Sequence, residues 1–304
     1  MIRTLLAAAV AAPWVLWAVV RVRGGETSAA LTSALSFTPY AALTAIVPVV
    51  VALLLRRRLV ALAALIPAVA LMSFVVPRAT GGADAATART PRLTVMSVNL
   101  HIAGADPADV LRLAREHDVD VLAVQESDPV WIERFDEAGG LAVFPHLRAQ
   151  PEDEALFSRR RMGATGVRSL PEGDVALGDA TLRFSVIHPR PPLSGAWMDS
   201  WREELVAIPD ADDVPRGTVR VLVGDFNATL DHAELRNVLA RGYRDAANTV
   251  GAGLKPTWPA GRRYPPLITI DHVLTSGGVR VLSFDTLAVR DTDHRAIVVE
   301  LAAP

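Results

Sequence analysis

The chain has 304 residues, of which 51% are hydrophobic and 21% are charged, and it contains no cysteine. This length permits a large domain and a further segment. Residues 1–78 hold seven of the 31 basic and one of the 33 acidic residues, so residues 79–304 carry 24 basic and 32 acidic side chains and a net charge of −8. An acidic domain disfavours tight, nonspecific binding of nucleic acid, which needs a basic surface. The absence of cysteine is compatible with export.

Three apolar runs precede the acidic part of the chain. Residues 4–20, 31–55 and 59–76 contain no charged side chain, and each approaches or exceeds the ~20 apolar residues that cross a bilayer. We therefore predict a membrane region over 1–77 with three transmembrane helices at these positions. A cleaved signal peptide is the alternative for the first run, but two more apolar runs follow it directly.

The charges between the apolar runs predict how the chain is oriented. The basic turn 56–58 joins the second and third runs, and such a turn stays on the cytoplasmic side. The N-terminus then lies inside and everything after Val76 lies outside, although Arg21 and Arg23 oppose this orientation. The prediction is an integral protein of the cytoplasmic membrane with an extracytoplasmic domain.

A linker and one domain follow the membrane region. Residues 78–92 are rich in Ala, Gly, Thr and Asp and lack apolar periodicity, which indicates a linker. Residues 93–304 have a size that one fold can fill, and they show no internal repeat.

The domain begins with a strand, a helix and a second strand. The first strand covers 93–98 and ends on Asn99, a helix begins at Asp106, and the next strand covers 119–124 and runs into Glu126. Strand, helix and strand in so short a span predict a parallel pair. Asn99 and Glu126 then lie at the C-terminal edge of the sheet, where open α/β sheets bind ligands.

Polar side chains accompany the later strands as well. Five further strands are predicted, over 155–158, 182–187, 221–223, 268–274 and 296–301. Two helices are predicted over 127–138 and 197–208, and a third begins at Asp231 with a capping-box pattern. His188 follows one of these strands, Asp225 and Asn227 follow another, Asp271 lies inside the next, and Asp293-His294 precedes the last.

These polar residues form a candidate site in which oxygen ligands dominate. Carboxylate and amide oxygens suit a hard cation such as Mg²⁺, with Mn²⁺ as the alternative, whereas a zinc site would use thiolates or more imidazoles. Two histidines suit proton transfer and the stabilisation of phosphate oxygens. The set predicts hydrolytic phosphoryl transfer.

Five segments resemble the endonuclease/exonuclease/phosphatase superfamily in order and rough spacing. This group includes DNase I, AP endonucleases, neutral sphingomyelinases and inositol-polyphosphate 5-phosphatases. The segments are Ser97-Val98-Asn99, Val124-Gln125-Glu126, Gly224-Asp225-Phe226-Asn227, Ile270-Asp271-His272-Val273 and Thr292-Asp293-His294-Arg295. The resemblance covers 93–304 and implies a four-layered α/β sandwich of the DNase I-like type, with two stacked mixed sheets between helices.

The resemblance implies a metal side and a water side of the site. Glu126 resembles the main metal carboxylate, with Asn99 beside it and Asp293 as a second acid on the metal side. Asp225 resembles the residue that positions or deprotonates the attacking water, and Asn227 resembles its phosphate-orienting partner.

The two histidines acquire roles from the same resemblance. His294 resembles the histidine that contacts the scissile phosphate, and Asp271 resembles the carboxylate that orients it. His188 matches the second histidine of the DNase I-like pattern. The candidates for its acidic partner are Glu152, Asp153 and Glu154.

Some positions depart from the family pattern or have a simpler interpretation. His101 stands where many members have Asp or Asn, and Thr292 replaces the usual Ser. Trp197 and Trp201, four apart on a predicted helix, indicate core packing. The histidines interpreted as structural or surface residues are His101, His146, His232 and His272.

The sequence thus predicts a membrane-anchored, Mg²⁺-dependent phosphodiesterase or phosphomonoesterase that acts outside the cytoplasmic membrane. The alternatives are an extracytoplasmic DNA or RNA nuclease and a non-catalytic protein that binds phosphate or lipid head groups. The predicted partners are the lipid bilayer and a phosphoester, namely a phospholipid head group, a nucleotide or a nucleic acid; no protein partner is predicted.

Overall fold

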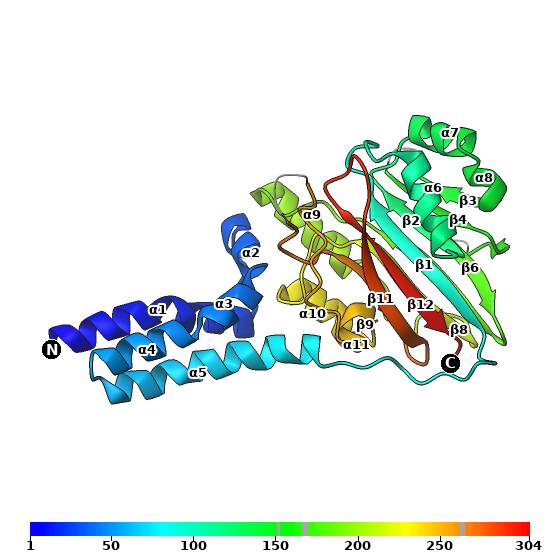
Figure 1. Ribbon diagram of the computed structural model, residues 1–304. Coiled ribbons are helices and arrows are strands. Elements are labelled where there is room, and N and C mark those ends of the chain that lie inside the picture. Colours follow the sequence, from blue (N-terminus) through cyan, green and yellow to red (C-terminus); the bar gives the residue numbers. More distant parts are fainter. Residues whose placement is uncertain (151–152, 166–169, 262–264) are drawn as a thin grey trace.

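A computed structural model of the chain describes residues 1–150, 153–165, 170–261 and 265–304. It consists of an N-terminal group of helices that projects from an α/β domain (Figure 1). The predicted position Glu152 lies outside the described residues.

The N-terminal region is helical throughout. Its elements are α1 (Ile2–Arg23), α2 (Ala29–Leu35), α3 (Thr38–Thr44), α4 (Ile46–Leu54), α5 (Arg58–Val75) and the 3₁₀ helix η1 (Val76–Ala79). Among the described residues, two helices are long and apolar enough to cross a membrane, Ile2–Arg23 and Arg58–Ala79. The first and third predicted spans therefore form continuous helices.

The second predicted span, 31–55, is not one straight helix. Its parts 29–35 and 38–54 meet at an angle of 59°, so a third span exists only if this bent pair counts as one. Ser28 caps α2 by accepting a hydrogen bond from the Leu31 amide, and Pro39 stands in the first turn of α3. A proline is favourable there because its nitrogen needs no helical partner, and a new helix begins as a result.

The helices α1, α4 and α5 pack through small side chains. Ala7, Ala11, Ala52, Ala61 and Ala64 form one buried cluster with Val49. Large apolar side chains point outward instead; they include Leu5, Leu16, Leu53, Leu62 and Ile66. Small residues at the helix contacts allow the backbones to approach closely, as in membrane helix bundles.

The α/β domain has four layers, and this confirms the predicted sandwich. One sheet has the strand order β11-β12-β1-β2-β4-β3 and the other has the order β5-β6-β7-β8-β10-β9. The strands are β1 (Arg92–Asn99), β2 (Val121–Gln125), β3 (His146–Ala149), β4 (Glu154–Ser158), β5 (Met162–Gly163), β6 (Glu172–Leu177), β7 (Ala180–Ile187), β8 (Thr218–Asp225), β9 (Arg244–Asp245), β10 (Asp271–Thr275), β11 (Arg280–Ala288) and β12 (Arg295–Ala302).

Helices cover the outer face of each sheet. One face is covered by α6 (Pro107–Glu116), α7 (Pro129–Glu137) and α8 (Gly140–Val143), and the other by α9 (Gly195–Val206) and α10 (Ala233–Ala240). The short helix α11 (Ala246–Thr249) instead packs into the cluster between the sheets. The largest buried cluster joins the facing sheets, with Val95 and Ile297 from one and Phe184 and Val223 from the other. Alternating apolar residues fill this space because successive side chains of a strand point to opposite faces.

Two parallel strand pairs fix the edge that carries the polar residues. β1 pairs in parallel with β2, as predicted, and β7 pairs in parallel with β8. Each pair is joined by a crossover with a helix, so the C-terminal ends of all four strands lie at one edge. The antiparallel strands β10 and β12 begin at this same edge, since Asp271 is opposite Asp225 and Ile297 is opposite Ser97.

Three local predictions were wrong. β10 begins at Asp271, so this residue opens the strand and does not lie inside it. Asp231 does not cap α10, because arginines bind its carboxylate and His232 occupies the N-cap position. Trp201 is fully buried as expected, whereas the side chain of Trp197 is exposed.

One buried carboxylate connects the helical region to the α/β domain. Arg21 at the end of α1 lies 2.7 Å from Asp231 Oδ1, and Arg78 in η1 binds both oxygens of Asp231 at 2.6 and 2.8 Å. Burial alone would raise the pKa of Asp231, but the two guanidinium groups outweigh it and lower the pKa. The Ala233 amide also donates to Glu26, which lies between α1 and α2.

Candidate active site

A cavity of about 390 Å³ lies at the edge where the parallel strands end. Six of the eight predicted site residues line it: Glu126, His188, Asp225, Asn227, Asp293 and His294. The other two, Asn99 and Asp271, are buried directly behind them and contact them by hydrogen bonds. The structure therefore brings the whole predicted set together.

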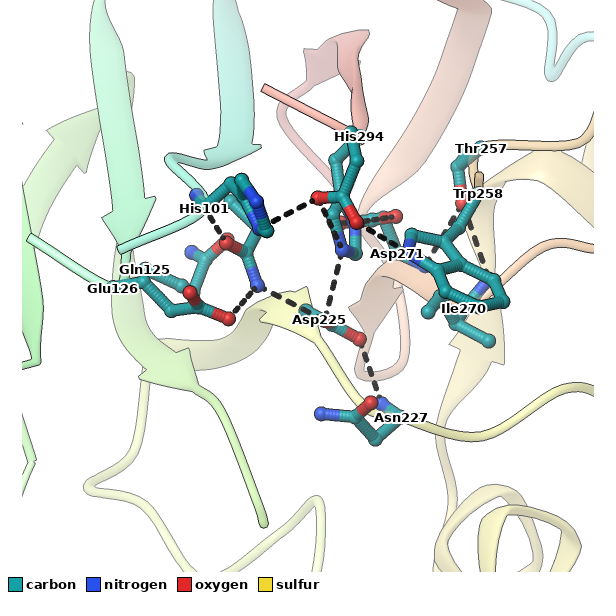
Figure 2. Close-up of polar contacts among 12 residues, drawn as sticks. His101, Gln125, Glu126, Asp225, Asn227, Thr257, Trp258, Ile270, Asp271 and His294 are labelled. Carbon is teal, nitrogen blue, oxygen red and sulfur yellow. Dashed lines mark hydrogen bonds and ion pairs between the residues drawn. The ribbon is translucent and has the colours of Figure 1, made fainter. Parts of the chain in front are cut away.

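Asp271, His294 and Asp225 form a buried row (Figure 2). His294 Nδ1 lies 3.0 Å from Asp271 Oδ2, and its other ring nitrogen, Nε2, lies 3.7 Å from Asp225 Oδ2. Thr292 Oγ1 accepts a hydrogen bond from the His294 amide and donates one to the Asn99 carbonyl. The threonine thus supplies the hydroxyl that serine supplies in the family pattern, and it joins the histidine loop to the end of β1.

The carboxylates around His294 keep its imidazole charged. Burial by itself lowers the pKa of His294, but Asp271, Asp225 and Asp293 outweigh it and raise the pKa to about 10. The pKa of Asp225 is raised, which suits a proton acceptor. Burial and the neighbouring Asp271 raise this pKa, and they outweigh His294 and His188, which lower it.

His188 has the same arrangement on the opposite side of the cavity. Its Nδ1 lies 3.0 Å from Asp153 Oδ1, and its Nε2 lies 3.7 Å from Glu126 Oε1. Burial lowers the pKa of His188, but the hydrogen bond to Asp153 and the nearby Asp225 and Glu126 raise it to about 9. Asp153 is therefore the partner among the sequence candidates. The pKa of Glu154 rises to about 7, because it is buried and lies beside Asp153.

Glu126 is held by an unusual backbone. Glu126 has φ 56°, and His101, Ile102 and Ala103 have φ between 50° and 56°. This left-handed region is uncommon for residues other than glycine and concentrates at functional sites. The turn aims the Ile102 amide at Glu126 Oε2 at 2.7 Å, while Asn99 Nδ2 donates to Glu126 Oε1 at 2.9 Å.

The segment after β8 depends on Gly224. This residue has φ 148°, and a Cβ placed on it would lie 2.1 Å from the Ile187 carbonyl oxygen of the adjacent β7. Only glycine allows this close approach. Asp225 Oδ1 then accepts a hydrogen bond from the Asn227 amide at 2.8 Å, and Asn227 Nδ2 donates to the Pro189 carbonyl at 3.0 Å.

Two further residues belong to the site, His101, which was interpreted as a structural or surface histidine, and Trp258, which no sequence pattern indicated. His101 Nδ1 lies 3.2 Å from Asp293 Oδ1, and the Trp258 indole donates to Asp293 Oδ2 at 3.0 Å. Both His101 and Trp258 line the cavity. The signal for His101 was its position two residues after Asn99, whereas Trp258 lies in an irregular segment that carries no motif.

The donor atoms in the cavity fit a hard divalent cation. Glu126 and Asp293 line the cavity with carboxylate oxygens, the ligands that Mg²⁺ and Mn²⁺ prefer. Asn99 lies directly behind them and has an amide oxygen that also accepts a hydrogen bond from the His101 amide. The atom Asp293 Oδ1 is buried and lies 3.2 Å from His101 Nδ1 and 3.9 Å from His294 Nε2. It accepts no hydrogen bond of good geometry from the described residues, so it keeps lone pairs that could face a cation.

Among the described residues, two groups of acids and histidine are close enough to hold a metal ion. They are Asp153, Glu154 and His188, and Asp225, Asp271 and His294. In each group an aspartate already hydrogen-bonds the histidine ring. These groups are therefore better suited to keep the imidazoles protonated than to ligate a metal.

The helical region closes one side of the cavity. Thr32, Ser33, Ser36 and Phe37, in α2 and the turn that follows it, line the cavity together with the polar residues. His232 at the start of α10 donates from Nε2 to the Thr32 carbonyl at 2.8 Å and accepts from the Thr229 amide through Nδ1. Burial lowers the pKa of His232, so it serves as a neutral structural link.

Comparisons with known proteins agree with this fold. A four-layered sandwich with acids and histidines at the strand ends defines a class of phosphoester hydrolases. Residues 96–294 match the model of the Endonuclease/Exonuclease/phosphatase family, and the chain belongs to this family. Its members hydrolyse phosphoester bonds and use divalent metal ions.

Solved structures show the same fold. An endonuclease/exonuclease/phosphatase family protein from Bacteroides thetaiotaomicron is 16% identical over 71% of this chain and 99% of that chain, with a TM-score of 0.54. TDP2 from D. rerio in complex with a single-strand DNA product is 14% identical over 69% and 98%, with a TM-score of 0.54.

The 3′ phosphatase NExo from Neisseria bound to a product DNA hairpin is 16% identical over 68% of this chain and 98% of that chain, with a TM-score of 0.52. A comparison with the sequences of curated proteins finds no significant match.

Proposed function

We propose that this protein is a membrane-anchored, Mg²⁺-dependent phosphoesterase that hydrolyses a phosphodiester or phosphomonoester outside the cytoplasmic membrane. In this proposal residues 1–77 are the membrane region, 78–92 the linker and 93–304 the catalytic domain. The observation that carries it is the position of Asp225 in a cavity where two of the histidines, His188 and His294, are both held protonated by aspartates.

The residues divide the work of hydrolysis between a base and two cationic donors. Asp225 accepts the proton of the attacking water, which its raised pKa favours. His294 and His188 donate hydrogen bonds from Nε2 to the phosphate oxygens and offset their growing negative charge. Asp271 keeps His294 protonated and correctly oriented, and Asn227 orients the phosphate.

Glu126, Asn99 and Asp293 are the residues that would hold the cation. When bound, Mg²⁺ or Mn²⁺ supplies Lewis-acid stabilisation of the phosphate oxygens. Asn99 also donates to Asp225 Oδ2 at 3.1 Å, so the same side chain connects the metal ligands to the base.

Two features of the helical region support anchoring in a membrane. Its large apolar side chains face outward and its small ones face inward, which suits a lipid environment. The basic turn 56–58 and the N-terminus lie at the end of the bundle farthest from the α/β domain (Figure 1). Arg21 and Arg23 opposed this orientation in the sequence; Arg21 forms an ion pair with Asp231, whereas Arg23 is exposed.

The test uses the full chain in detergent micelles and measures hydrolysis with Mg²⁺ and with EDTA. The substrates are bis-p-nitrophenyl phosphate, p-nitrophenyl phosphate and plasmid DNA, each also incubated with the Asp225→Ala variant. We expect metal-dependent turnover that Asp225→Ala reduces by about 10²–10⁴-fold, the usual contribution of a positioned acid or base. Equal turnover by the folded variant would refute the mechanism, and cleavage of DNA alone would establish the nuclease alternative.

A further inference from the structure

The lining of the catalytic cavity is part charged and part apolar. Beside the acids and histidines it includes Phe37, Pro191, Leu193, Ile268 and Ile270. None of the described residues that line the cavity is lysine or arginine. A site that follows a nucleic-acid backbone uses such residues to neutralise successive phosphates. This lining therefore suits a substrate with a single phosphate and an apolar part.

A second cavity adjoins the first and is mainly apolar. It has a volume of about 420 Å³ and lies between α3, the end of α5 and the segment before β10. Ser36 and Ile268 line both cavities. The two volumes fall within the ~300–1,000 Å³ typical of small-ligand pockets.

The second cavity leads toward the outward-facing surface of the helices. Leu43 and Met72 line it and are 74% and 42% exposed, so this side opens toward the surface that we assign to lipid. On the α/β domain, Leu254 and Leu267 line the opposite wall. Tyr40 in α3 donates to the Leu267 carbonyl at 2.9 Å and holds the two walls in position.

From this continuity we infer that the substrate is a membrane phospholipid or another phosphoester with a long hydrocarbon chain. Its phosphate lies against His188 and His294, and its hydrocarbon chain passes Ser36 and Ile268 into the second cavity. This inference rests on the proposed function and adds the class of substrate to it. An α2 helix that only anchored the domain would not need to line the catalytic cavity.

The test compares phosphodiesters that differ only in chain length. The full chain in detergent micelles receives methyl, butyl and octyl p-nitrophenyl phosphate below their micelle-forming concentrations, and release of p-nitrophenolate gives kcat/KM. A fully buried methylene group contributes about 0.8 kcal/mol, or about fourfold, so we expect octyl to exceed methyl by at least about 100-fold.

Matched variants test whether the dependence on chain length arises in the second cavity. Leu254→Glu and Leu267→Glu place a carboxylate on the wall of the second cavity, and we expect each to lower the octyl-to-methyl ratio at least tenfold. The control is Val206→Glu, which adds the same charge at an aliphatic side chain of α9 that is 65% exposed and lines neither cavity. We expect this control to leave both rates unchanged.

The outcomes separate this inference from the proposed function. Hydrolysis of the methyl ester without any gain from the longer chains would overturn the inference and leave the phosphoesterase in place. Failure to hydrolyse any of these diesters, or the monoester p-nitrophenyl phosphate, with Mg²⁺ would overturn the proposed function.

A binding experiment tests the inference without turnover. A hexadecyl phosphate with a diazirine at the end of its chain is cross-linked to the full chain with EDTA present, and the labelled peptides are identified by mass spectrometry. We expect labelling within 36–43, 253–254 and 267–269, and competition by octyl phosphate at concentrations where inorganic phosphate has no effect. Labelling spread evenly over the outer faces of α1 and α5 would overturn the inference.

Discussion

Asp271→Asn should change the pH at which the enzyme works. The wild-type pKa of His294 is about 10, and Asp271 is the largest of the effects that raise it. With a neutral amide in its place, the pKa falls toward the ordinary value of 6.5. At pH 8 the protonated fraction of His294 then falls from about 99% to about 3%, roughly a 30-fold loss of the active form. At pH 6 most of the His294 side chains are protonated again, so most of the activity returns.

The assay is hydrolysis of bis-p-nitrophenyl phosphate from pH 5.5 to 9, with each aliquot brought to one alkaline pH before absorbance is read. Asp245→Asn is the matched control, because Asp245 lies 2.8 Å from the buried His272 outside the catalytic cavity. We expect Asp245→Asn to lower stability but leave the pH profile in place. The reasoning fails if the ratio of rates at pH 6 and pH 8 is the same for wild type and Asp271→Asn.

Three further outcomes follow from the same contacts. Glu126→Gln should raise the Mg²⁺ concentration for half-maximal rate at least tenfold, measured by titration after EDTA treatment, because it removes the negative ligand. Asp231→Asn should destabilise the chain by about 3–5 kcal/mol, since it leaves Arg21 and Arg78 buried without their counter-charge; Arg23→Gln, on an exposed arginine nearby, is the control in thermal unfolding. His188 has a folded pKa of about 9, above the ordinary 6.5, so its contribution to stability is complete below pH 6.5 and disappears as the pH rises through 9. Thermal unfolding between pH 6 and 10 should show this loss, and His188→Gln should reduce it to the part that His294, with a pKa of about 10, contributes.

Much of the active site could be predicted because its residues occupy ends of strands. Asn99 and Glu126 follow two strands joined by a short helix, and chain topology alone places such strand ends together. The partner of His188 remained open, because Asp153 lies in a loop whose path no periodic pattern specifies. Its 3.0 Å contact depends on how β4 and β7 face each other across the two sheets.

The helical region was harder to predict for a different reason. Hydropathy detects apolar runs but not the break between α2 and α3, although Ser28 and Pro39 are local signals for it. The contacts of Arg21 and Thr32 with the α/β domain join residues about 200 positions apart. Such pairings depend on the complete three-dimensional structure, and a single sequence carries no trace of them.

The position of α2 has a consequence for proteolysis. A protease that cut the exposed stretch between η1 and β1 would separate the α/β domain from a wall of its own catalytic cavity. It would also allow the arginines to leave Asp231, so that a buried carboxylate would face water. We therefore expect shedding to inactivate the protein, and the uncut chain to be the form in which any biological activity is found.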